Sequence, residues 1–119
     1  MNQEFENFSI RPIEQEDSEK YFQFIEKNRE RIARYFPRTL SRNQDVEASG
    51  LFIAELIALR EKKEFASFLI IDKISQQIIG TVFLKDFDWN VGKVEIGFFI
   101  DWMHWGVMSY EFSVMSYEL

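Results

Sequence analysis

The sequence predicts a mixed α/β domain of the α+β class, in which one strand and two helices precede a three-stranded antiparallel meander. Apolar residues recur at helical spacing over the first half of the chain and form near-continuous runs over the second half. Two short polar segments, 73–77 and 89–93, separate those runs. Because a parallel connection needs a dozen or more residues, strands joined by such short turns must be antiparallel.

The first half of the chain is predicted to begin with a strand at 8–13. Pro12 favours the end of this strand, since proline cannot donate to a sheet. Asp17 is a suitable N-cap for the helix that follows, and Pro37 ends that helix. The apolar face of the helix consists of Phe22, Ile25, Ile32 and Phe36, flanked by Tyr21 and Phe24.

A second helix is predicted near 42–62, with Ser41 and Gln44 as its capping box. The three apolar runs that follow are predicted strands: 65–72, 78–88 and 94–101. We expect the first helix to bury its apolar face against this meander, at Phe68, Ile70, Val82 and Leu84.

Length and composition predict a single soluble domain over residues 1–119. Hydrophobic residues make up 46% of the chain, yet no apolar run is long enough to cross a bilayer, and the N-terminus does not resemble a signal peptide. A cytoplasmic location is therefore expected. The net charge of −6 disfavours nucleic acid as a partner, and the lack of cysteine excludes disulfides and thiolate metal ligands. With one histidine, His104, no metal site is expected.

Three segments, in the same order and spacing, resemble the N-terminal half of GNAT-type N-acetyltransferases of the RimJ/RimL branch. The first is residues 8–39, with its Arg-Pro pair, its Asn28-Arg29-Glu30 element and Pro37. The second is the Ile79-Gly80 start of the middle strand of the meander. The third is the last strand, which carries Glu95, Ile96, Gly97 and Asp101.

The resemblance implies transfer of an acetyl group from acetyl-CoA to a primary amine, with a protein or peptide N-terminal amine as the acceptor. It places the pantetheine arm of acetyl-CoA along Phe98, Phe99 and Ile100, and its pyrophosphate near Gly106. Acetyl transfer needs alignment, a base and an oxyanion donor rather than an enzyme nucleophile. Glu95 is the candidate base, and its alternative role is a carboxylate on the solvent face of the strand.

The resemblance ends after the fourth family strand, which implies a domain whose C-terminal half is missing. Residues 102–119 are expected to form an atypical tail, in which VMSYE occurs twice. An uncovered strand edge recruits other chains, so we expect a homo-oligomer formed through residues 94–119. Two alternatives stay open: a non-catalytic interaction module that pairs through this edge, and a small-ligand binding domain that uses the aromatic residues without chemistry.

Overall fold

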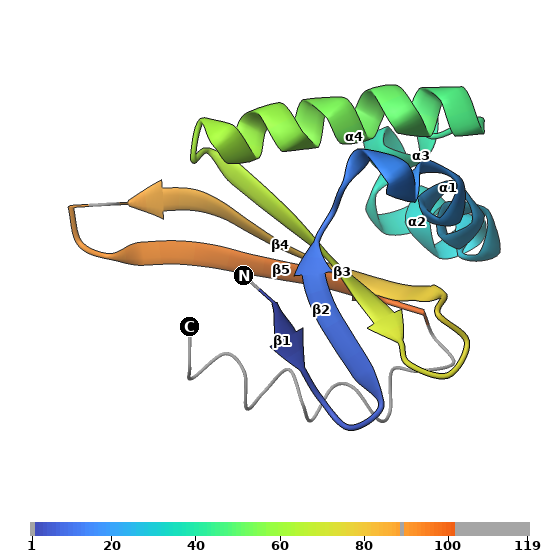
Figure 1. The fold of residues 1–119 in the computed structure, drawn as a ribbon. Coiled ribbons are helices and arrows are strands. Elements are labelled where there is room, and N and C mark those ends of the chain that lie inside the picture. The colour runs from blue at the N-terminus through green and yellow to red at the C-terminus, as the bar shows by residue number, and fades with distance from the viewer. Residues whose placement is uncertain (1, 89, 102–119) are drawn as a thin grey trace.

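The structure, a computed structural model, describes residues 2–88 and 90–101. It contains one antiparallel sheet with the strand order β1-β2-β3-β4-β5, and helices α1 to α4 lie on one face of this sheet (Figure 1). The mixed α/β class is therefore confirmed. The elements are β1 (Gln3–Glu4), β2 (Phe8–Pro12), the 3-10 turn η1 (Gln15–Asp17), α1 (Ser18–Lys27), α2 (Arg29–Tyr35), α3 (Pro37–Ser41), α4 (Val46–Glu61), β3 (Phe65–Asp72), β4 (Ile78–Asp88) and β5 (Lys93–Ile100).

The strands of the meander follow the predicted bounds closely. β3 and β4 have the bounds that the apolar runs predict, and β5 begins and ends one residue earlier than predicted. The sequence did not predict β1, which pairs only two residues with β2. A register irregularity between Lys85 and Asp88 interrupts the pairing of β4 with β5, and Asp86 has a positive φ of 54° there.

The first predicted helix is divided at Asn28, whose backbone leaves the helical region at φ −110° and ψ 21°. Asn28 is buried, and its side-chain amide donates to the carbonyl of Phe24 at 3.0 Å. This bond gives the last turn of α1 a local polar partner, which is the usual way in which asparagine competes with helix continuation. α2 then starts in a new direction and ends before Pro37.

The predicted capping box of Ser41 and Gln44 is wrong. Both side chains instead bond back to carbonyls of the preceding turn, and Ser41 is the last residue of α3. Asp45 caps α4, since it has an extended backbone and its carboxylate accepts the N–H of Ala48 at 2.7 Å. An Asp directly before the apolar run outcompetes the more distant Ser.

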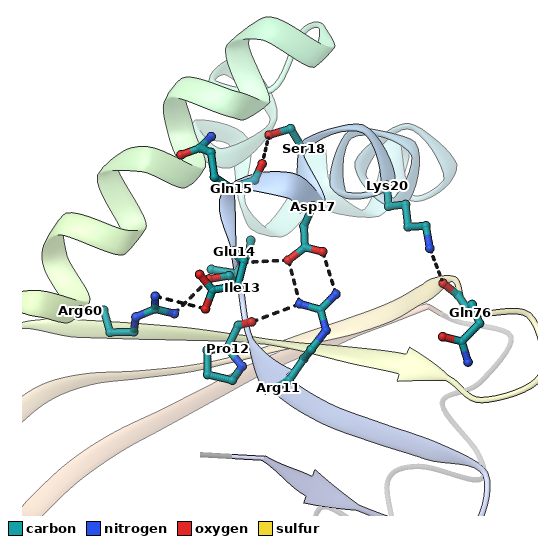
Figure 2. Close-up of polar contacts among 10 residues, drawn as sticks. All are labelled: Arg11, Pro12, Ile13, Glu14, Gln15, Asp17, Ser18, Lys20, Arg60 and Gln76. Atoms are coloured by element: carbon teal, nitrogen blue, oxygen red, sulfur yellow. Dashed lines mark hydrogen bonds and ion pairs between the residues drawn. The ribbon is translucent and has the colours of Figure 1, made fainter.

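Asp17 anchors the start of α1 to the sheet (Figure 2). It is 4% exposed, and its carboxylate accepts two hydrogen bonds from Arg11 at 2.7 and 2.8 Å and a third from the backbone N–H of Glu14 at 2.8 Å. Burial alone would raise the pKa of Asp17, but the hydrogen bonds from Arg11 and Glu14 lower this pKa below its ordinary value. At the other side of the same turn, Arg60 of α4 donates to the carbonyl of Ile13 at 2.9 Å. The chain leaving β2 is thus fixed to both α1 and α4.

The two faces of the sheet carry separate apolar clusters. Under the helices, Ile25 and Ile32 pack with sheet residues such as Leu69, Ile71 and Phe99. The strand residues predicted to contact the first helix are wrong. They belong to a second cluster, which includes residues of β2 and to which no described helix contributes. These residues are Phe68, Ile70, Val82 and Leu84. Strand side chains alternate between faces, and β3 is apolar on both, so its sequence does not indicate which set meets the helices.

Candidate functional site

The candidate site lies along β5, which in the described part of the chain has a strand neighbour on one side only, β4. Asp101, directly after β5, donates its backbone N–H to Ile79 of the β4 side at 2.8 Å. Backbone groups of successive residues alternate between the two sides of a strand. The peptide groups of Phe99 therefore point toward β4, and those of Phe98 and Ile100 point to the outer edge.

The residues predicted to bind acetyl-CoA are placed differently from one another. Phe98 is 38% exposed, whereas the side chains of Phe99 and Ile100 are buried at 8% and 1% exposed. The Phe99 ring lies under the helices, in edge-to-face contact with the rings of Phe24 and Phe36 at centroid distances of 6.0 and 5.8 Å. The side chain of Phe99 thus packs within the core, and the peptide groups that face the outer edge of β5 belong to its neighbours, Phe98 and Ile100. Gly106 lies outside the described residues.

Two cations from the first helices hold the end of β5. Arg31 of α2 places its guanidinium 4.5 Å from the centroid of the Phe99 ring and donates to the carbonyl of Ile100 at 2.9 Å. Lys27, at the end of α1, forms an ion pair at 2.7 Å with Asp101, which is 1% exposed. These contacts fix the backbone of the predicted pantetheine strand relative to the helix layer. The spacing of the basic residues gave no signal that either would reach this strand.

Glu95, the predicted base, lies on the helix-covered face of β5 with its side chain 58% exposed. It is opposite Lys85 of β4 in the sheet register, and the two side chains form an ion pair at 3.8 Å. Both readings of Glu95 remain compatible with this geometry, since an exposed carboxylate beside an ammonium can serve as a base or as a surface charge. The position of Lys85 matters for another reason: it also lines a pocket.

This pocket, which we call the helix-side pocket, has a volume of about 270 Å³ and lies between the helix layer and strands β3 to β5. Its walls are mainly aromatic, including Phe36, Phe65, Phe83 and Phe99. The lining residues are spread along the chain from Tyr21 to Phe99, so no local motif could have predicted the pocket. It shares the face of the sheet on which Glu95 lies.

Residues 7–111 match the family model of the acetyltransferase (GNAT) domain, and the chain belongs to this family. A comparison with curated proteins gives no match. Within the described ranges, no helix is long and apolar enough to cross a membrane, and no group of three or more His, Cys, Asp or Glu residues could hold a metal ion.

Solved structures of acetyltransferases share the fold. The ribosomal-protein-S5-alanine acetyltransferase from Vibrio fischeri has 22% identity and a TM-score of 0.79, with 97% of this chain and 64% of that chain covered. RimL, a ribosomal L7/L12 alpha-N-protein acetyltransferase in complex with coenzyme A, has 16% identity and a TM-score of 0.72, with 88% and 59% covered. The microcin C7 self immunity acetyltransferase MccE, in complex with acetyl-CoA and AMP, has 15% identity and a TM-score of 0.74, with 87% and 56% covered. The chain thus spans less than two thirds of each of these relatives.

Proposed function

We propose that the protein transfers an acetyl group from acetyl-CoA to a primary amine, and that the acceptor is the N-terminal amine of a protein or peptide. The observation that carries this proposal is the family match over residues 7–111. Two neighbours in structure are named as acetyltransferases of ribosomal proteins, which supports a protein acceptor. The cytoplasmic location expected from the sequence is part of the same proposal, since acetyl-CoA and such an acceptor would meet there.

The β5 edge fits the pantetheine arm of acetyl-CoA. This arm carries amide groups that pair with backbone in the way that an added strand does. Phe98 and Ile100 direct their peptide groups to the outer edge, so we assign the contact to their backbone, while Phe99 supports the strand from below through its buried ring. The carbonyl of Ile100 already accepts a hydrogen bond from Arg31. We therefore assign the N–H of Ile100, and not its carbonyl, to the contact with the pantetheine arm. Gly106 remains the proposed pyrophosphate contact on the sequence alone.

Glu95 is proposed as the base. The acceptor arrives as an ammonium and must lose one proton, which Glu95 accepts directly or through one water. The freed nitrogen lone pair forms the new C–N bond to the acetyl carbonyl carbon, and the C–S bond breaks. The nitrogen then gives up its second proton to become an amide nitrogen, and the CoA thiolate takes up that proton. A backbone N–H of the β5 edge would stabilise the charge that develops on the carbonyl oxygen. Lys85 forms an exposed ion pair with this carboxylate at 3.8 Å.

The first test is a calorimetric titration with acetyl-CoA. The second test measures acetyl transfer to a mixture of peptides by mass spectrometry. Glu95→Gln should lower kcat by about 100-fold or more at neutral pH, the lower end of what a general base contributes, while the affinity for acetyl-CoA stays unchanged. Glu47→Gln, at an exposed carboxylate of the first turn of α4, is the matched control. The absence of acetyl-CoA binding would overturn the proposed function. Equal kcat values for the two variants would overturn only the role of Glu95.

A second candidate function is an interaction module that pairs through the β5 edge. It is favoured by the position of β5 at the end of the strand order and by the 38% exposure of Phe98. Under either function we propose that the chain forms a homo-oligomer through residues 94–119. Sedimentation at micromolar concentration tests this, and a monomer at all concentrations would contradict it. An oligomer that does not bind acetyl-CoA would favour the interaction module.

A further inference from the structure

The helix-side pocket is built to enclose a flat or branched apolar group. Phe83 stacks on Phe65 with a centroid distance of 5.7 Å and an interplanar angle of 15°, and Phe36 meets Phe83 edge-on at 6.3 Å. Phe36 also meets Phe99 edge-on at 5.8 Å. These rings support one another, so the pocket walls are rigid aromatic surfaces with room for about 270 Å³ between them. This volume is near the lower end of the range for ligand pockets, roughly 300–1,000 Å³.

Three residues that carry hydroxyl groups also line the pocket. Tyr21, Ser67 and Thr81 are 5%, 6% and 9% exposed, and none of their side-chain hydroxyls forms a hydrogen bond with another described residue. Their hydroxyl oxygens are not fully enclosed, so water can reach them although the residues as a whole are buried. Burial also raises the pKa of Tyr21, so its hydroxyl stays protonated and can donate. The three hydroxyl groups give a mainly apolar pocket a few polar positions, as is usual for ligand pockets.

The charged residues that line the helix-side pocket restrict the kind of side chain that it can bind. Among the described residues that line the pocket, Lys85 is the one cation and none is a carboxylate. A cationic side chain would therefore lose its hydration there without gaining a carboxylate partner in the wall. Glu95 pairs with Lys85 on the same face of the sheet, so the proposed base lies next to a residue that lines the pocket.

We propose that the helix-side pocket binds a large, uncharged apolar side chain of the acceptor, of leucine to phenylalanine size, and so selects amines that carry such a side chain close to the reacting nitrogen. This inference rests on the proposed function and names the substrate class of the same site. Four aromatic walls favour a ring in edge-to-face contact, and the hydroxyls can bond to polar atoms of the adjoining peptide. Full burial of such a side chain corresponds to an affinity gain of about 10- to 100-fold over glycine.

The test uses three small probes with the full chain: phenylalanylglycine amide, lysylglycine amide and glycylglycine amide. Their binding is followed by NMR in the absence of acetyl-CoA. We expect the phenylalanyl probe to bind at least 10-fold more tightly than either other probe, and to shift the signals of Phe36, Phe83 and Thr81. Equal affinity for all three probes, or shifts confined to other residues, would overturn the inference.

A substitution in the pocket distinguishes binding at this site from non-specific binding of the probe. Thr39 of α3 lines the pocket, whereas Ser41 of the same helix does not. Thr39→Phe should fill part of the pocket and weaken binding of the phenylalanyl probe by at least 10-fold, while Ser41→Phe leaves its affinity unchanged. Ser67→Val, which removes a hydroxyl and adds bulk from the sheet side, gives an independent check if Thr39→Phe does not fold. Unchanged binding in the folded pocket variant would overturn the inference.

The same samples distinguish this inference from the proposed function. Binding of acetyl-CoA with no preference among the probes contradicts the pocket assignment and leaves acetyl transfer in place. A preference for the phenylalanyl probe without any binding of acetyl-CoA contradicts acetyl transfer and leaves an apolar peptide site.

Discussion

Gly97 of β5 leaves room for the ring of Phe83, and its replacement by alanine should show how closely the pocket wall and the proposed acetyl-CoA strand are coupled. The two residues are cross-strand partners. A Cβ at residue 97 would lie 2.3 Å from Cε2 and 2.4 Å from Cζ of Phe83. To restore an ordinary contact of 3.4 Å, the ring must move by about 1.1 Å. It would move against Phe65 and Phe36, which already contact it.

The expected magnitude follows from two opposing effects. Overpacking costs about 1–3 kcal/mol, and removing a glycine from a strand recovers about 0.5–1 kcal/mol. Gly97→Ala should therefore lower the free energy of unfolding by about 1–2 kcal/mol, which is a fall in Tm of about 4–10 °C for a domain of this size. Urea denaturation and thermal unfolding measure both values. Binding of the phenylalanyl probe should weaken as well, because the displaced ring enters the pocket.

A double-mutant cycle tests the cause. In Phe83→Leu the smaller side chain makes room for the new Cβ, so the double variant should be more stable than the sum of the two single effects by about 1 kcal/mol. Additive effects, within about 0.5 kcal/mol, would show that the ring does not oppose the substitution and would refute this reasoning.

The Asp17 network and the α4 glycine give two further predictions. Asp17→Asn should lower the free energy of unfolding at pH 7 by about 1–3 kcal/mol, since it removes charge-assisted bonds to a partly exposed Arg11. Because the folded pKa of Asp17 is lowered, this contribution is complete above its ordinary value of 3.8 and is lost as the pH falls through the folded pKa, so urea titrations should show the two proteins converging below about pH 4. Gly50→Ala should instead stabilise by about 0.5–1 kcal/mol in the same assay, because its Cβ would meet Ser18 Oγ at an ordinary 3.5 Å within a helix. A destabilised Gly50→Ala would show that α1 and α4 pack more tightly than this distance indicates.

The elements that depend on local pattern could be predicted from the sequence. β3 and β4 have their predicted bounds because each apolar run ends at a polar turn of five residues or fewer. The division of the first helix at Asn28 could not be predicted from the sequence, since Asn-Arg-Glu-Arg is compatible with a continuous helix. The break coincides with a local bond from the Asn28 side chain to the carbonyl of Phe24, four residues earlier, which competes with helix continuation and which helix propensity does not predict.

The candidate site shows the same division. The family resemblance could place Glu95 and the 98–100 segment on one strand, since they lie close together in the sequence. It could not show that Phe99 is a core residue, because the sheet face that meets the helices is not encoded in a strand that is apolar on both sides. Nor could it find the helix-side pocket, whose walls meet only after the helices dock on the sheet.

Arg31 offers a test of whether the helix layer holds the proposed acetyl-CoA strand in position. Its guanidinium covers Phe99 and donates to Ile100, so Arg31→Met removes a cation–π contact and a charge-assisted hydrogen bond but keeps an apolar stem. Together these contacts are worth about 1–3 kcal/mol. Arg29→Met is the control, since Arg29 pairs with Glu26 on the exposed side of the helices, where ion pairs contribute about 0–1 kcal/mol.

The two arginine variants should also differ in their affinity for acetyl-CoA. Without the bond from Arg31, the end of β5 is less fixed, so the pantetheine edge must be ordered when acetyl-CoA binds, and its Kd should rise in Arg31→Met but not in Arg29→Met. Arg31→Lys should fall between Arg31→Met and the unmodified protein, because an ammonium can donate to the Ile100 carbonyl but cannot stack on the Phe99 ring as a planar guanidinium does. Calorimetric titration of the three variants with acetyl-CoA gives the order of their Kd values directly. If Arg31→Met and Arg29→Met lose equal stability and bind acetyl-CoA equally, the helix layer does not position β5, and the geometry of the edge is set by its pairing with β4 alone.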